Sequence, residues 1–313
     1  MEKFDSKLAN WLRVYYLNCY AQSTTLFSCQ ASSKPKSRTV NMAKTLSKSA
    51  AEKEARLLDI FQKYGEVLIA YSGGVDSTYL ADVAHEALGK KAHLLIADSP
   101  SIPREELREA VEIAEKRDWQ LAVVNTNEFE NGDFLQNDKM RCYYCKGTLF
   151  KTMREYADKN NIPVIIYGET ADDGFDITRV GKLAAREGNA KAPLAEVGFT
   201  KDEIRECSRA RNLPTWNKPS FACLASRIPT GTAISPAILA KIEAAEELLR
   251  SLGCQQYRAR HHETICRIEV SETDFPLLLE KETRQQLVKA IKELGYRYVT
   301  VDLAGYRTGS TAG

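Results

Sequence analysis

The sequence lacks several features that would place it in familiar classes of protein. No apolar run approaches the roughly 20 residues that cross a bilayer, so we expect no membrane span. The formal net charge is only +2, which argues against a protein that coats nucleic acid. Eight cysteines in 313 residues fall short of the density of a disulfide scaffold. We therefore expect a cytoplasmic protein that is long enough for two domains.

Two motifs that would identify a binding site directly are also missing. No G-x-x-x-x-G-K-[ST] sequence occurs, which excludes a Walker A nucleotide loop. Only one C-x-x-C is present, and the one pair of histidines, His261 and His262, is adjacent rather than spaced. A complete Cys₄ or Cys₂His₂ zinc site is therefore poorly supported.

A glycine-rich turn takes the place of the Walker loop. Residues 66–70 are apolar and partly β-branched, as in a buried strand, and apolar residues recur at helical spacing from Tyr79 onward. The turn between them reads Ser72-Gly73-Gly74-Val75-Asp76-Ser77-Thr78. Glycine lets the backbone approach a ligand closely, and the N–H groups and hydroxyls of such a turn suit a phosphate. A carboxylate would repel phosphate, so we expect Asp76 to hold Mg²⁺ or to orient the loop.

Apolar runs alternate with helical patterns over residues 47–215. We expect helices over 47–64, from about 103 and from 200, and strands over 66–70, 92–97, 120–124 and 162–167. This alternation predicts an α/β fold with a doubly wound parallel sheet, whose ligands bind at the carboxyl ends of the strands. The further residues expected at that edge are Asp98, Ser99, Gly168 and Glu169.

A polar loop with four acids and one arginine follows Gly168. Its position at the sheet edge favours a role for Glu169, Asp172, Asp173 and Arg179 in binding ATP with Mg²⁺. A solvated turn without chemical function is the alternative.

Three cysteines stand apart from the core. Cys142 and Cys145 form the C-x-x-C, and Cys223 lies in a loop rich in proline. Alone, the C-x-x-C is equally compatible with a redox dithiol, half of a zinc site or two ordinary cysteines. Three thiolates can hold a [4Fe-4S] cluster and leave one iron open for a hydrosulfide, whereas three unrelated cysteines are the alternative.

Residues 216–313 contain that cysteine loop and the pattern of a smaller C-terminal α+β domain. We expect helices over 235–252 and 275–294 and strands over 256–261, 264–270 and 297–303. Arg258, Arg260 and Arg267 alternate along two strands, so we expect them on one face of a sheet. Arginines bind phosphates and carboxylates in a bidentate manner, and we group Arg227 with them. A solvated strand face is the alternative.

These segments together resemble one family. The SGGVDS turn resembles the PP-loop of the ATP pyrophosphatase superfamily. With the GETADDGFD loop, the segment from Trp216 to Arg227 and the C-terminal GYRYVTVDLAGYR, the chain resembles the LarE family of ATP-dependent sulfur transferases from about residue 47 onward. The resemblance implies that a carboxylate of pyridinium-3,5-dicarboxylic acid mononucleotide is adenylated and then converted to a thiocarboxylate. It implies ATP and Mg²⁺ as cofactors and catalytic roles for Asp76, Cys223 and Arg227.

The family has two subtypes that differ in their sulfur source. In one, a cysteine in the position of Cys223 gives up its own sulfur; in the other, that cysteine and a C-x-x-C bind a [4Fe-4S] cluster. With its C-x-x-C, this chain resembles the second subtype, with three cysteine ligands and sulfide or another sulfur donor. The expected partner is a small-molecule nucleotide, and we also expect a homo-oligomer.

Two other functions stay open on the sequence alone. A PP-loop tRNA thiolase with an iron-sulfur cluster would need a basic RNA-binding surface, which the balanced charge does not favour, so we do not expect nucleic-acid binding. A non-catalytic nucleotide-binding regulator would have no use for three cysteines at the same edge as the phosphate loop.

Residues 1–46 differ in composition from the rest and have little to bury. A transit peptide and a gene-model artefact, with Met42 as the true start, are both open explanations. We expect residues 1–41 to be dispensable, so a chain that starts at Met42 should keep the soluble yield and the activity of the full chain. Loss of either on truncation would show that the segment is structural or targeting.

Overall fold

The structure is a computed structural model that describes residues 46–175, 181–219 and 222–307. Arg179 and residues 1–45 of the predicted extension lie outside the described residues. The elements in chain order are α2 (Lys48–Tyr64), β1 (Val67–Ala70), α3 (Val75–Leu88), η1 (Gly89–Lys91), β2 (Ala92–Asp98), α4 (Arg104–Lys116), β3 (Gln120–Asn125), η2 (Glu128–Glu130), α5 (Gly132–Leu135), α6 (Arg141–Asn160), β4 (Val164–Tyr167), η3 (Asp172–Phe175), α7 (Gly181–Glu187), α8 (Pro193–Glu196), α9 (Lys201–Ala210), η4 (Leu224–Arg227), α10 (Pro236–Ser251), β5 (Tyr257–His262), β6 (Ile265–Val270), α11 (Phe275–Leu279), α12 (Lys281–Glu293) and β7 (Tyr298–Val301).

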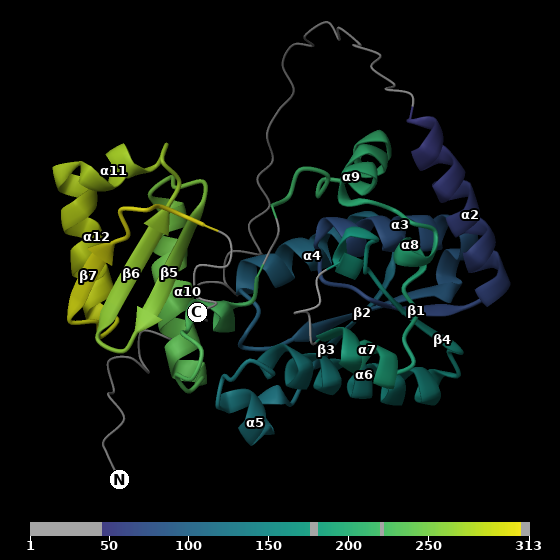
Figure 1. Cartoon of the computed structure of the whole chain (residues 1–313), viewed down its shortest axis with the longest axis horizontal. Helices are drawn as coiled ribbons and strands as arrows, with labels where there is room; N and C mark the ends of the chain where they lie inside the picture. Colours follow the sequence, from purple (N-terminus) through teal and green to yellow (C-terminus); the bar gives the residue numbers. More distant parts are fainter. Residues whose placement is uncertain (1–45, 176–180, 220–221, 308–313) are drawn as a thin grey trace, which may run out of the picture. The chain divides into compact units, whose positions relative to one another are not determined.

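The larger sheet has the strand order β3-β2-β1-β4, and all its pairs are parallel. Val67 and Ile69 of β1 pack with α2, α3 and α9 on one face, whereas Leu68 packs with α6 and α7 on the other. Both faces are therefore covered by helices, as Figure 1 shows, which explains why these strands read as continuous apolar runs. The predicted doubly wound parallel sheet is confirmed.

The smaller sheet is mixed and has the order β5-β6-β7. β5 and β6 are antiparallel, β6 and β7 are parallel, and the core between this sheet and α10, α11 and α12 is apolar. The helix predicted over 275–294 is wrong as one element. Glu280 adopts φ −58° and ψ 135°, an extended conformation that ends α11 and precedes the first residue of α12. None of the helices in the described ranges is long and apolar enough to span a membrane.

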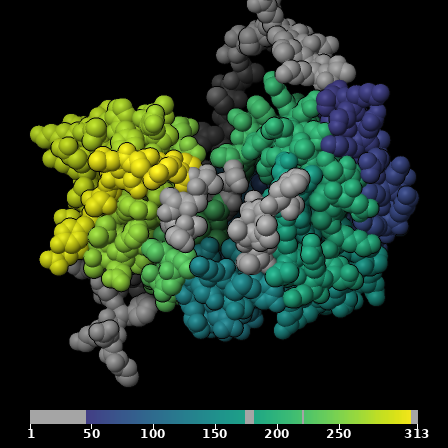
Figure 2. All heavy atoms as spheres, in the orientation of Figure 1, coloured from purple at the N-terminus to yellow at the C-terminus, as the bar shows by residue number. Residues whose placement is uncertain are grey.

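Helix α9 begins where the sequence predicts it. The hydroxyl of Thr200 accepts a hydrogen bond from the N–H of Glu203, and the Glu203 carboxylate accepts one from the N–H of Thr200, which makes a capping box. Lys53 of α2 forms an ion pair with Glu203 at 2.7 Å. In Figure 2 the purple side chains of α2 lie directly beside the green side chains of this region. One carboxylate therefore both starts α9 and joins it to α2.

We expect Glu203→Gln to lower the free energy of unfolding by about 1–2 kcal/mol at neutral pH, because the cap and the ion pair both weaken. Burial opposes the charge, but hydrogen bonds from Lys53 and Thr200 outweigh it and lower the pKa of Glu203 to about 2. A lowered pKa stabilises the fold above the unfolded-state pKa, and this contribution disappears as the pH falls towards about 2. Urea titrations at pH 7 and pH 3 should thus show a smaller difference between variant and wild type at pH 3.

Asp202→Asn is the matched control because it changes an exposed acid in the same helical turn. An equal loss of stability in both variants at pH 7 would contradict this account of Glu203.

Candidate active site

The glycine turn joins β1 to α3. Gly73 has φ +69°, and a Cβ added there would lie 2.6 Å from the Cβ of Ala110, so only glycine fits. The hydroxyls of Ser72 and Ser77 lie 3.0 Å apart, and the N–H of Ser72 donates to Ser77 Oγ at 3.1 Å. Gly74 precedes α3 without a side-chain cap, which leaves N–H groups at the helix start for an anion.

The end of β4 approaches this turn closely. A Cβ on Gly168 would lie 3.1 Å from the backbone nitrogen of Ser77 and 3.3 Å from Asp76 Cβ. The sheet edge therefore brings Gly168 to the phosphate loop, as the sequence predicts. Thr78 is fully buried and its backbone N–H donates to Gly74 O at 3.0 Å, while the contact of its hydroxyl with a ligand stays a prediction.

Asp76 is the charged residue of the turn. One oxygen, Oδ2, forms an ion pair with Lys201 Nζ, and the other, Oδ1, is buried without a hydrogen-bond partner in the described part of the chain. Burial raises the pKa of Asp76, and Lys201 acts against this rise. A carboxylate oxygen held open in this way suits Mg²⁺, which takes one or two carboxylates together with phosphate oxygens. The sequence analysis missed Lys201, since nothing in its local pattern marks it.

The acidic loop after Gly168 is folded onto its neighbours as far as the structure describes it. Glu169 pairs with Lys182 at 3.0 Å, and Asp173 Oδ2 accepts hydrogen bonds from the N–H and hydroxyl of Thr170, both at 3.0 Å. Asp172 accepts the first N–H of α9 at 2.6 Å. The described part of this loop is therefore held by partners within the protein, and its binding of ATP stays a prediction. The charge of Asp173 also raises the pKa of Asp76.

Asp98 and Ser99, at the end of β2, have partners within the protein. Asp98 forms an ion pair with Arg104, whose guanidinium also donates to the carbonyl of Ser99. The hydroxyl of Ser99 is buried and donates to the carboxylate of Glu128. Both residues lie at the predicted edge, but their side chains organise the turn after β2.

Two of the three predicted cluster cysteines, Cys145 and Cys223, lie against one apolar cluster. Cys142 and Cys145 occupy the first turn of α6, while Cys223 directly precedes η4. All three are free thiols, and Cys145 and Cys223 pack against the same apolar cluster. Burial raises the pKa of Cys145, and the nearby Cys223, Glu128 and Cys142 raise it further. Cys207, Cys254 and Cys266 are buried elsewhere, as expected.

The described residues do not form a site for a single metal ion at these cysteines. In the ranges that the structure describes, no group of three His, Cys, Asp or Glu side chains is arranged to hold one metal ion. A [4Fe-4S] cluster needs less convergence, because each thiolate binds a different iron. The cluster on Cys142, Cys145 and Cys223 stays a prediction.

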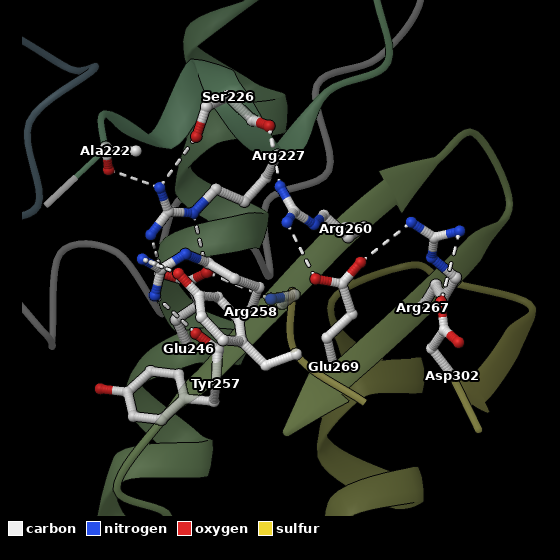
Figure 3. A network of polar contacts seen from close by, with 12 residues as sticks. Ala222, Ser226, Arg227, Glu246, Tyr257, Arg258, Arg260, Arg267, Glu269 and Asp302 are labelled. Atoms are coloured by element: carbon white, nitrogen blue, oxygen red, sulfur yellow. Dashed lines mark hydrogen bonds and ion pairs between the residues drawn. The ribbon is translucent and has the colours of Figure 1, made fainter. Parts of the chain in front are cut away.

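The strand arginines share one face, as Figure 3 shows. Arg260 lies opposite Arg267 in the β5–β6 register, and Arg258 lies opposite Glu269. Glu269 accepts an ion pair from Arg260 at 2.8 Å and one from Arg267 at 3.0 Å. The opposite face of these strands packs into the apolar core, so the predicted alternation is confirmed.

Arg227 is a buried arginine that contacts the loop carrying Cys223. Its side chain is 1% exposed and makes a bidentate pair with Glu246 of α10, with bonds of 2.9 and 3.0 Å. The same guanidinium donates to the carbonyl of Cys223 at 2.9 Å. Arg227 therefore contacts the backbone of the cysteine predicted to act in catalysis.

Arg258 differs from its neighbours in having no ion pair with a carboxylate among the described residues. It donates to the carbonyl of Tyr257 at 2.7 Å and to the hydroxyl of Tyr306 at 3.4 Å, and it lies 5.0 Å from the Tyr306 ring centroid. Burial lowers the pKa of Arg258, and the charges of Arg227 and Arg260 lower it further. The charge of Glu246 acts against this lowering. An arginine without a carboxylate partner suits an anionic ligand.

Known proteins resemble this chain over most of its length. No family model matches the chain. An uncharacterized protein from Synechocystis is 38% identical over 259 residues, which cover 82% of this chain and 96% of that protein. A pyridinium-3,5-bisthiocarboxylic acid mononucleotide synthase from Lactiplantibacillus plantarum is 31% identical over 263 residues, which cover 83% of this chain and 93% of that protein.

The chain belongs to the LarE family. This assignment confirms the predicted resemblance and the prediction of an enzyme of the sulfur-transferase type. The [4Fe-4S] subtype, the individual site residues, the domain boundaries, the homo-oligomer and the cytoplasmic location stay predictions.

Proposed function

We propose that this LarE-family enzyme uses ATP to convert a carboxylate of pyridinium-3,5-dicarboxylic acid mononucleotide into a thiocarboxylate. The proposal rests on a hydrogen bond that joins the cysteine loop to the turn after β2. The N–H of Leu224, beside Cys223, donates to the carbonyl of Ser101 in the turn after β2 at 2.8 Å. This bond ties the residue after Cys223 to the end of the sheet where β2 ends, which supports the proposal. The synthase name of the relative from L. plantarum supports the choice of substrate.

The nucleotide would bind at the turn between β1 and α3. Uncapped N–H groups at the start of α3 would hold the β- and γ-phosphates as they leave, with the hydroxyls of Ser72 and Ser77 beside them. Asp76 Oδ1 would hold Mg²⁺, which neutralises charge on the departing pyrophosphate. Lys201, paired with Asp76 here, lies where it would meet the same phosphates.

Two displacements complete the reaction. A substrate carboxylate oxygen attacks the α-phosphorus of ATP, the bond from that phosphorus to the bridging oxygen breaks, and pyrophosphate leaves. Sulfide sulfur then attacks the acyl carbon, the bond from that carbon to the AMP oxygen breaks, and AMP leaves. Adenylation is needed because a carboxylate oxygen is otherwise a poor leaving group.

Cys142, Cys145 and Cys223 would hold the [4Fe-4S] cluster, which when bound offers an open iron position for external sulfide. The protein's own contribution is to keep these thiols together. Arg227 fixes the backbone of Cys223, and the partly buried environment of Cys145 limits access of water.

Arg258 would bind the phosphate or a carboxylate of the substrate. We expect Arg258→Gln to raise the KM for the nucleotide substrate about 10- to 100-fold with a smaller change in kcat, because it removes an ionic contact made before and during the reaction. Steady-state kinetics over a range of substrate concentrations would measure both constants. Arg297→Gln is the control, since that exposed arginine contacts Tyr298 outside this network. A lower kcat with an unchanged KM would contradict a binding role.

The test of the function is reconstitution. Anaerobically purified protein, incubated with ATP, Mg²⁺, sulfide and the dicarboxylic nucleotide, should release AMP and pyrophosphate. Mass spectrometry of the small molecules should show replacement of one oxygen by sulfur. Pyrophosphate release without sulfur incorporation would support adenylation and reject sulfur transfer. The absence of both products would reject the whole proposal.

A further inference from the structure

Glu128 is a buried carboxylate beside the thiols. It lies in η2, is 2% exposed, and its Oε2 has no hydrogen-bond partner in the described ranges. Its Oε1 accepts hydrogen bonds from the hydroxyls of Ser99 and Ser101. Burial of a carboxylate with an unsatisfied oxygen is unfavourable, so another part of the structure is expected to depend on it.

The serines that hold Glu128 also hold the cysteine loop. The hydroxyls of Ser99 and Ser101 lie 2.7 Å apart, and the N–H of Ser101 donates to Ser99 Oγ at 3.0 Å. These bonds close the turn after β2, and the carbonyl of that turn, on Ser101, accepts the N–H of Leu224 at 2.8 Å. A continuous series of hydrogen bonds thus runs from Glu128 to the residue next to Cys223.

Helix η2, which carries Glu128, also contacts α6, which carries the C-x-x-C. Glu128 lies close enough to Cys145 for its charge to act on that thiol, and so does Cys223. Phe134 and Leu224, which are fully or almost fully buried, belong to the apolar cluster against which Cys145 and Cys223 pack. Glu128 is therefore set between the turn after β2 and the two elements that carry the thiols.

We propose that Glu128 is a positioning residue for the thiol group, which it aligns by fixing the Ser99–Ser101 turn and hence the backbone beside Cys223. This inference rests on the proposed function only in that Cys145 and Cys223 act together. Glu128 needs to touch neither the substrate nor the transferred sulfur. Two hydrogen bonds from serine hydroxyls compensate for the burial of the Glu128 carboxylate. We call the hydrogen bonds that join Glu128, Ser99 and Ser101 the clamp. An apolar residue at position 128 would not form it.

Thiol cross-linking tests the clamp independently of activity. Dibromobimane becomes fluorescent when it bridges two nearby thiols, and peptide mass spectrometry locates the bridge. In cluster-free, full-length protein we expect a bridge between Cys223 and a C-x-x-C thiol, chiefly the exposed Cys142, because burial raises the pKa of Cys145 and slows its alkylation. Glu128→Ala should lower its yield at least about fivefold, because the loop no longer keeps the thiols close. Glu128→Gln keeps an oxygen for the serine hydroxyls and should stay within about twofold of wild type.

Glu130→Gln is the matched control, because Glu130 is an exposed glutamate of the same short helix and should leave the yield unchanged. All variants are compared at a temperature where each is folded by circular dichroism, since a purely structural role would lower the melting temperature without changing the yield.

Each outcome bears on the proposal. A Glu128→Ala protein that bridges like wild type overturns the clamp but leaves the thiol group intact. A wild type without the bridge overturns both the clamp and the proposed thiol group. If Glu128→Ala does not fold, Ser101→Ala decides: a lowered yield supports the clamp, and an unchanged yield overturns it.

Discussion

Asp76→Asn should reduce pyrophosphate release about 100- to 1,000-fold and leave the protein folded. The amide keeps the shape of the side chain but lacks the charge that would bind Mg²⁺, and it no longer pairs with Lys201 as an ion. The double variant Ser72→Ala with Ser77→Ala should cause a comparable loss. It removes the hydroxyls that organise the turn, since Ser77 Oγ accepts the N–H of Ser72 and donates to the carbonyl of Gly74.

The pH dependence should follow from the burial of Asp76. Burial raises the pKa of this carboxyl, so the residue takes up a proton at a higher pH than an exposed aspartate does. The charged form is the one that would bind Mg²⁺, so pyrophosphate release should fall on the acid side at a pH above the ordinary aspartate pKa. High Mg²⁺ concentrations should move this fall in pyrophosphate release to lower pH, because the metal and the proton compete for the Asp76 carboxylate.

Glu86→Gln provides the control for a lost carboxylate on α3. Glu86 is half exposed and pairs with Arg211, away from the glycine turn. It should keep full pyrophosphate release. Coupled phosphate detection measures the release, and circular dichroism checks the fold. Normal release by Asp76→Asn and by the double serine variant would reject the phosphate-loop assignment.

The main architecture follows from local sequence patterns. Strands β1, β2 and β4 are short and largely buried, so their apolar runs identify them without knowledge of the fold, whereas the edge strand β3 is partly exposed. Their carboxyl ends must meet at one edge, which is why the glycine turn and Gly168 were correctly placed together. The alternation of Arg258, Arg260 and Arg267 likewise predicted their common face.

The missed residues depend on partners far away in the chain. Lys201 reaches Asp76 across 125 positions, and only the packing of α9 against α3 brings the two together. Glu128 is an unremarkable acid in a polar segment until the fold buries it against Ser99 and Ser101. Asp98 was placed at the correct edge, but Arg104, six residues later, already binds it. Local spacing predicts where a strand ends and cannot predict which distant side chain arrives there.

The source of the transferred sulfur determines how many turnovers each chain completes. With a [4Fe-4S] cluster on Cys142, Cys145 and Cys223, sulfide added in excess should support many turnovers, and the mass of the polypeptide should not change. A sacrificial Cys223 would instead stop after one transfer per chain. It would then lose the mass of one H₂S as the thiol becomes dehydroalanine. Intact-protein mass spectrometry after reaction separates the two mechanisms.

Single cysteine variants make the same distinction from the protein side. Cys142→Ala and Cys145→Ala should lose bound iron and reduce sulfur transfer at least about 100-fold, because an incomplete ligand set does not hold the cluster. Pyrophosphate release should persist, since the phosphate loop lies apart from these thiols in the sequence and uses other groups. Cys254→Ala removes a buried thiol from the C-terminal core and serves as the control for iron content. Full transfer activity in both C-x-x-C variants, together with the loss of H₂S from wild type, would reject the cluster and establish Cys223 as the donor. Cys145 and Cys223 pack against the same apolar cluster, so the Cys145→Ala variant tests whether this second thiol takes part in the transfer.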